Sequence, residues 1–92
     1  MNQSTNQRAR TLNQLRKQID RIDLKLLRLL NDRAALAVRI GDLKRKQGLP
    51  VFDGRREREV LSRLTRTQRG PLPPVSLLRI FRKILSESRK LQ

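Results

Sequence analysis

The sequence predicts an all-α fold, a three-helix protomer with one long N-terminal helix, paired in an intertwined homodimer. Apolar residues recur at steps of three and four in three segments, glycine and proline separate these segments, and no segment alternates as a β-strand does. This spacing is typical of helices that each bury one stripe. The longest series is Leu12, Leu15, Ile19, Ile22, Leu26, Leu29, Leu36, Ile40 and Leu43.

The first helix is expected from Leu12 to about Lys46, because Gly41 is the only glycine in this stretch and no proline occurs in it. Gly48 and Pro50 then end the helix, since glycine favours the C-terminal cap and proline cannot continue a helix. Residues 1–9 are expected to form a disordered or frayed leader, and residues 10–92 a single domain.

Two shorter helices are expected after the first. Asp53 is a suitable N-cap for a helix from about Gly54 to Thr67. The glycine and prolines of residues 69–74 interrupt the chain before a third helix, from about Val75 to the end of the sequence. The inward-facing residues of these two helices are expected to be Val60, Leu61, Leu64, Leu77, Leu78, Phe81, Ile84 and Leu85.

The length of the first helix predicts the dimer. About 35 residues at ~1.5 Å per residue make a rod of roughly 50 Å. A globule of this chain length is only roughly 32 Å across. The apolar stripe therefore needs cover from a second chain, which a two-fold symmetric dimer supplies.

Composition excludes several classes of function. The chain has no cysteine and no histidine, which excludes disulfides, thiolate or imidazole metal sites, and Ser/His or Cys/His catalytic pairs. No metal or cofactor is therefore expected. The first residues lack a secretory signal and no apolar stretch is long enough to span a membrane, so a cytoplasmic protein is expected.

The net charge of +15 allows two interpretations. Such an excess attracts nucleic acid, and it also concentrates small anionic substrates. Two Phe and no Tyr or Trp leave no platform for stacking bases, which disfavours a nucleic-acid partner. A nonspecific phosphate binder stays open on charge alone.

Arg33 interrupts the apolar stripe, where burial of an unpaired charge costs several kcal/mol. Lys44 lies eleven residues later, within about 20° on the same helix face. Arg16 is about 25 Å away along the helix, too far for the same site in one chain, but it can reach the partner's site. Ser88 and Gln92 continue the inward line of the third helix, and together these groups suit a small polyanion with a hydroxyl.

Each of these residues also has an ordinary structural interpretation. Arg33 can extend its guanidinium past the stripe into water, and Lys44 alone suits a solvated helix end. Asp53 can serve only as a cap, and the charges around Glu57 are usual for an exposed helix start. Ser88 and Gln92 lie where helices fray.

At this point the chain resembles a known family. The stretches LNQLRKQIDRIDLKLLRLLNDRAALAVRIGDLK, LPVFDGRREREVL and IFRKILSESRKLQ are similar to the three helices of all-helical, AroQ-type chorismate mutases, over residues 12 to 92. The resemblance implies an intertwined dimer with two identical active sites. Because 92 residues leave no room for the further domains often fused to such modules, a monofunctional enzyme is expected. The polar positions that agree are Leu15-Arg16, Arg33, Lys44, Pro50-Val51-x-Asp53, Arg56-Glu57, Ser88 and Gln92.

The resemblance also implies a reaction and a role for each residue. Family members convert chorismate to prephenate in aromatic amino acid biosynthesis, by a Claisen rearrangement that needs no nucleophile, base, metal or cofactor. Arg16 from the partner chain and Arg33 would bind the two carboxylates, with Ser88 assisting at the ring carboxylate. Lys44 and Gln92 would donate to the ether oxygen. The ring hydroxyl would be received by Asp53, through its backbone, and by Glu57, with Arg56 lining that end.

Two alternatives remain beside chorismate mutase. An isochorismate pyruvate lyase of the same fold has a similar cationic cage, although Glu57 as a hydroxyl acceptor favours the mutase. A noncatalytic basic helical dimer that binds nucleic acid would use the +15 charge instead.

Overall fold

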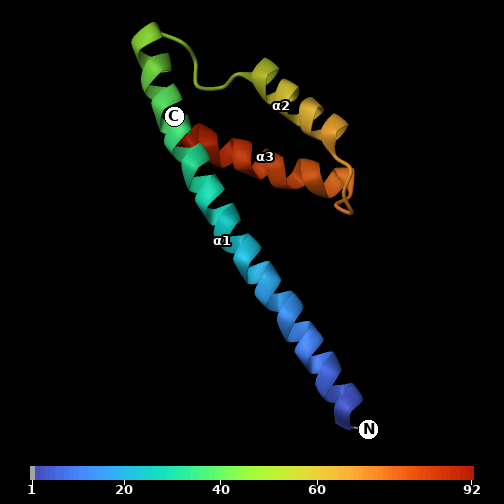
Figure 1. Cartoon of the computed structure of the whole chain (residues 1–92). Coiled ribbons are helices and arrows are strands. Elements are labelled where there is room, and N and C mark those ends of the chain that lie inside the picture. Colours follow the sequence, from blue (N-terminus) through green and yellow to red (C-terminus); the bar gives the residue numbers. More distant parts are fainter. Residues whose placement is uncertain (1) are drawn as a thin grey trace. The chain divides into compact units, whose positions relative to one another are not determined.

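The computed structural model describes residues 2–92, and their side chains from residue 6 onward. Three helices follow one another along the chain: α1 (Asn2–Gln47), α2 (Gly54–Thr67) and α3 (Pro74–Leu91) (Figure 1). No strand occurs in this described part of the chain. The all-α prediction with three helices is confirmed, and the bounds of α2 agree with the predicted ones.

The start of α1 differs from the prediction. The helix begins at Asn2, well before Leu12, where the apolar series begins. Residues 2–11 contain neither proline nor glycine. Extension of a helix that has already formed gains one backbone hydrogen bond for each residue that becomes ordered, so it is easier than starting a new helix. Helix geometry therefore continues beyond the part that has an apolar stripe. Met1 lies outside the described residues, and the division into a leader of residues 1–9 and a domain of residues 10–92 stays a prediction.

Gly48 ends α1 as predicted. Its φ of 68° is in the left-handed region, which glycine enters without a steric penalty. The Leu49 N–H donates to the Lys44 carbonyl at 2.8 Å, and the Gly48 N–H donates to the Arg45 carbonyl at 3.4 Å. These two bonds form a Schellman motif, which satisfies carbonyls that the helix end leaves without partners.

Asp53 caps α2 with its side chain. Its Oδ1 accepts from the Arg56 N–H at 3.0 Å, and its carbonyl accepts from the Glu57 N–H at 3.1 Å. At the other end of α2, the Gln68 side chain donates to the Leu72 carbonyl at 2.8 Å and orders the turn before α3. Pro74 opens α3 at a position where its missing N–H costs nothing.

Replacement of Asp53 by alanine is expected to lower the free energy of unfolding by about 1 kcal/mol, because the first turn of α2 loses its side-chain acceptor. Urea unfolding followed by circular dichroism measures this change. Asp53→Asn is the matched control, since asparagine caps as well as aspartate and should keep most of the stability. Equal stability of the alanine variant and the parent would contradict the capping role.

The chain divides into two units, Met1–Arg33 and Ala34–Gln92, at a point within α1. In the second unit α2 and α3 run in opposite directions and pack against each other (Figure 1). The buried hydrophobic residues are Ala37 of α1 and Leu77 and Leu85 of α3, and only the last two were expected, from the inward stripe of the third helix. Val60, Leu61 and Leu64 of α2 are half-buried, together with Leu78, Phe81 and Ile84 of α3.

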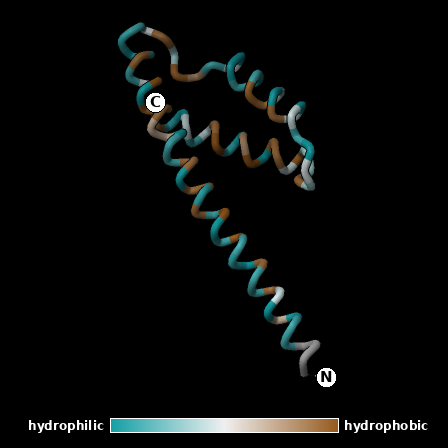
Figure 2. Tube along the Cα trace, in the orientation of Figure 1, coloured by the Kyte–Doolittle hydropathy of each residue, from teal (hydrophilic) through white to brown (hydrophobic). Residues whose placement is uncertain are grey.

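The first unit consists of the part of α1 up to Arg33, and its apolar residues are exposed. Leu29 retains 62% of its accessible surface and Ile19 retains 57%. Apolar residues recur along this part of the helix at the spacing predicted from the sequence (Figure 2). The exposed members of the stripe in this unit are Leu12, Leu15, Ile19, Ile22, Leu26 and Leu29.

Candidate active site

The candidate site in the second unit centres on Lys44, in the last turns of α1. The Lys44 Nζ donates to the Gln92 Oε1 at 2.7 Å and to the Val51 carbonyl at 2.7 Å. An ammonium group has three N–H donors, so two are engaged here and a third remains for a ligand. Since the amide oxygen of Gln92 accepts from Lys44, its Nε2 group keeps two donors for the same purpose.

Gln92 is held by its backbone as well as by its side chain. The Arg45 Nη1 donates to the Gln92 carbonyl at 2.5 Å, and Asp42 forms an ion pair with the same guanidinium. Gly41 provides the space for this approach, because a Cβ built there would lie 2.7 Å from the Gln92 Cα and 2.8 Å from its carbonyl oxygen. The end of α3 is therefore fitted onto α1 at a position where only glycine avoids a collision.

A second group of contacts surrounds Glu57, in the first turn of α2. The Arg89 Nη1 donates to the Glu57 Oε2 at 2.5 Å, and the two side chains retain only 35% and 21% of their accessible surface. The Arg89 guanidinium also lies over the Phe52 ring, 5.4 Å from its centroid. This arrangement joins α2, α3 and the segment between α1 and α2.

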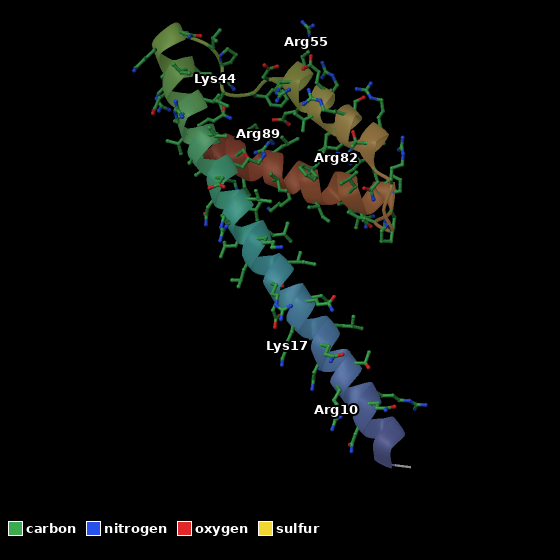
Figure 3. The ribbon with its side chains drawn as sticks, viewed as in Figure 1. Arg10, Lys17, Lys44, Arg55, Arg82 and Arg89 are labelled. Atoms are coloured by element: carbon green, nitrogen blue, oxygen red, sulfur yellow. The ribbon has the colours of Figure 1, made fainter. Side chains whose placement is uncertain are left out.

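Residues 51–53 contact all three helices of the second unit. The Val51 carbonyl accepts from Lys44 of α1, the Phe52 ring contacts Arg89 of α3, and the Asp53 carboxylate caps α2. Figure 3 shows Lys44 on α1 and Arg89 on α3, the two cations that this segment contacts. The segment thus links the Lys44 and Glu57 groups.

The remaining predicted residues are placed as follows. The Ser88 hydroxyl donates to the Ile84 carbonyl at 2.8 Å in the part-buried face of α3. Arg56 is exposed and forms a 3.9 Å ion pair with Glu59. Arg16 and Arg33 belong to the first unit, where Arg16 is exposed and Arg33 is half-buried. The roles of all eight predicted residues stay predictions.

Positive charge dominates the described residues near the site. Lys44, Arg45 and Arg89 contribute cations, whereas Glu57 is the acidic group that is most enclosed. On the exposed side of α3, hydrogen bonding from Lys90, and then from Lys83, lowers the pKa of Glu87. The excess of cations favours an anionic ligand.

Arg45, Arg89, Gly41 and Phe52 were not singled out from the sequence. Arg89 and Glu57 lie 32 positions apart, and no spacing rule connects side chains across separate helices. Gly41 carried a usable signal, because a lone glycine inside a long helix costs about 1 kcal/mol relative to alanine and so indicates a close approach.

Within residues 2–92, no group of three or more acidic side chains is arranged to hold a metal ion. No helix in the same described range combines the length and the apolar character that a membrane crossing requires.

Comparison with known proteins identifies the family. The family model for chorismate mutase type II matches residues 15–92, which include α2, α3 and the part of α1 from Leu15 onward. The chain belongs to the chorismate mutase type II family. A chorismate mutase structure from Thermus thermophilus (form II) superposes with a TM-score of 0.85 at 39% identity, covering 87% of this chain and 91% of that one.

Curated relatives of this chorismate mutase family member differ in length. The chain is 47% identical over 79 residues to a bifunctional chorismate mutase/prephenate dehydratase of Aquifex aeolicus (strain VF5), covering 82% of this chain but only 22% of that protein. It is 29% identical over 82 residues to the chorismate mutase of Methanocaldococcus jannaschii, covering 88% of this chain and 83% of that protein. The chain thus spans about a fifth of the length of the Aquifex relative.

Proposed function

We propose that the protein is a chorismate mutase, an isomerase that converts chorismate to prephenate in aromatic amino acid biosynthesis. The observation that carries the proposal is the Lys44–Gln92 hydrogen bond of 2.7 Å, in a chain that belongs to the chorismate mutase type II family. It places a charged donor and an amide donor side by side. A cytoplasmic location and chorismate as the substrate are part of the same proposal.

The rearrangement is concerted, so the protein must hold a flexible dicarboxylate in its compact form and stabilise charge in the transition state. One bond forms between carbon atoms while the ether C–O bond breaks, and negative charge grows on the ether oxygen. The third N–H of Lys44 and the Nε2 of Gln92 are the donors that we assign to this oxygen. Donors already fixed before the reaction are the most effective, because they need no reorganisation.

The other groups bind the ends of the substrate. We assign the two carboxylates to Arg33 and to Arg16 of the second protomer, with Ser88 at the ring carboxylate. The Asp53 side chain and carbonyl accept from the first turn of α2, so we assign the ring hydroxyl to the backbone N–H of Asp53. Glu57 keeps its Oε1 for that hydroxyl while its Oε2 accepts from Arg89, and Arg56 lines the same end.

In the assay, the purified protein is incubated with chorismate. The loss of the ultraviolet absorbance of chorismate and the formation of prephenate are measured. Turnover to prephenate supports the proposal. No turnover at micromolar enzyme would overturn it. Pyruvate release from isochorismate would indicate the lyase, and nucleic-acid binding in moderate salt without turnover would indicate the binding protein.

The proposal includes a homodimer in which the exposed stripe of α1 pairs with a second chain. The six apolar residues of the stripe in the first unit retain about half or more of their accessible surface: Leu12, Leu15, Ile19, Ile22, Leu26 and Leu29. An apolar series of this length on a helix surface is typical of an association face. The dimer would also bring Arg16 to the partner's site.

Replacement of Leu26 by glutamate is expected to raise the dimer dissociation constant by a factor on the order of 100 or more, because each protomer loses a buried leucine. Sedimentation velocity over a concentration series measures the change. Asn31→Glu is the control, since it adds the same charge about 140° around the helix. Equal dissociation constants for both variants would contradict this interface.

A further inference from the structure

Arg89 forms an ion pair of a different kind from the others described in this chain. Five other ion pairs join positions three or four apart within one helix, with at least half of each side chain exposed. The Arg89–Glu57 pair instead joins α3 to α2, and its side chains are 35% and 21% exposed. Such a pair fixes the position of one helix against another, which contacts within a single helix do not do.

Two contacts fix the Arg89 guanidinium itself. Its Nη1 donates to the Glu57 Oε2 at 2.5 Å, and its central carbon lies 5.4 Å from the centroid of the Phe52 ring. The guanidinium is planar, so contact with a ring face and a bond at one edge together restrict its orientation. Phe52 is in turn close to the start of α2, since a Cβ at Gly54 would lie 3.2 Å from the Phe52 Cζ.

The terminal torsion of a glutamate side chain is broad, so a carboxylate without a fixed partner samples many orientations. The bond from Arg89 restricts this freedom at Glu57, because it occupies Oε2 and leaves Oε1 for a ligand. We infer that Arg89 is a positioning residue, which holds the Glu57 carboxylate and the Phe52 segment in the arrangement that receives the substrate's ring hydroxyl. This inference rests on the proposed function.

The chemistry of the hydroxyl decides which kinetic constant should change. The ring hydroxyl takes no part in bond making or breaking, so its contact with Glu57 is nearly equal in the ground state and in the transition state. Loss of a uniform contact raises KM and leaves kcat nearly constant. A donor at the ether oxygen, in contrast, affects kcat.

The test is a double-mutant cycle with Arg89→Met and Glu57→Gln in the full chain, with chorismate as the substrate. We expect Arg89→Met to raise KM on the order of tenfold, with kcat changed less than about threefold. In the Glu57→Gln background, Arg89→Met should change KM less than about twofold, because the side chain at position 57 no longer carries the charge that Arg89 binds. Arg89→Lys keeps the charge but not the planar fork, and should raise KM by an intermediate factor.

Lys90→Met is the matched control for net charge. Lys90 is the neighbouring cation on α3, 66% exposed, and its Nζ donates to Glu87 at 3.1 Å. Lys90→Met should leave KM within about twofold, since an exposed charge is screened by solvent and salt. Circular dichroism checks that each variant is folded. If Arg89→Met does not fold, the same double-mutant cycle is measured with Arg89→Lys and Glu57→Gln, and its KM values test the positioning role.

The outcomes separate the two proposals. The positioning role would be overturned if Arg89→Met raised KM equally in the parent and in the Glu57→Gln background. It would also be overturned if Lys90→Met raised KM as much as Arg89→Met. Either result would leave chorismate mutase activity established. Absence of turnover by the parent protein would overturn the proposed function itself. A KM effect that disappears in the Glu57→Gln background supports the inference.

Discussion

Lys44→Ala is expected to lower kcat by about 10²–10³-fold or more, with the protein still folded and still dimeric. In the proposed mechanism Lys44 supplies a charged donor where negative charge grows in the transition state, and its bond to Gln92 orients the second donor. Removal of the ammonium therefore loses one donor and disorders the other. The measurement is steady-state turnover of chorismate.

Lys46→Ala is the matched control for Lys44→Ala, because Lys46 lies two positions further along α1 and is exposed. It removes the same charge from the same end of the helix without touching Gln92. Near-normal turnover by Lys44→Ala would show that the assignment of Lys44 to the ether oxygen is wrong. If both variants lost a similar fraction of kcat, the effect would be due to the change in net charge.

Gly41→Ala is expected to lower kcat on the order of 10-fold to 100-fold through Gln92. The added Cβ would lie 2.7 Å from the Gln92 Cα and 3.2 Å from its carbonyl carbon. These are backbone atoms that cannot rotate away, so the last turn of α3 must move and its amide leaves Lys44. Alanine favours a helix by about 1 kcal/mol over glycine, whereas overpacking costs about 1–3 kcal/mol, so the net change is destabilising.

Chorismate turnover and urea unfolding together measure the effect of Gly41→Ala. Gly70→Ala is the control, because its new Cβ would meet no atom closer than the Gln68 Nε2 at 3.9 Å. Unchanged kcat and a higher free energy of unfolding for Gly41→Ala would contradict the close approach. In that case the intrinsic helix preference of alanine alone would explain the effect of the substitution.

Much of the fold follows from local signals in the sequence. Asp53 and the prolines near residue 71 bound α2 because caps and breakers act within a few residues. Leu77 and Leu85 are buried because helical spacing places them on one face. The predicted start of α1 was wrong, since the end of an apolar series does not end a helix when nothing interrupts the backbone.

The candidate site was less predictable. Lys44 and Gln92 were predicted to converge, and they form a direct hydrogen bond across 48 positions of the chain. The family resemblance supplied that pairing, because spacing within one helix carries no information on another. Arg89 is not among the polar positions that carry the resemblance, and its bond to Glu57 depends on how α2 and α3 pack. The roles assigned to these residues stay predictions.

The range of these contacts has a consequence for folding. The backbone bonds of each helix, and caps such as the one made by Asp53, close over three or four positions. The contacts of the candidate site close over 48, 47 and 32 positions, from Lys44 to Gln92, from Arg45 to Gln92 and from Glu57 to Arg89. Long loops cost more entropy to close and form later than local turns. A variant can therefore show the full helical signal in circular dichroism while the side chains of its candidate site remain apart.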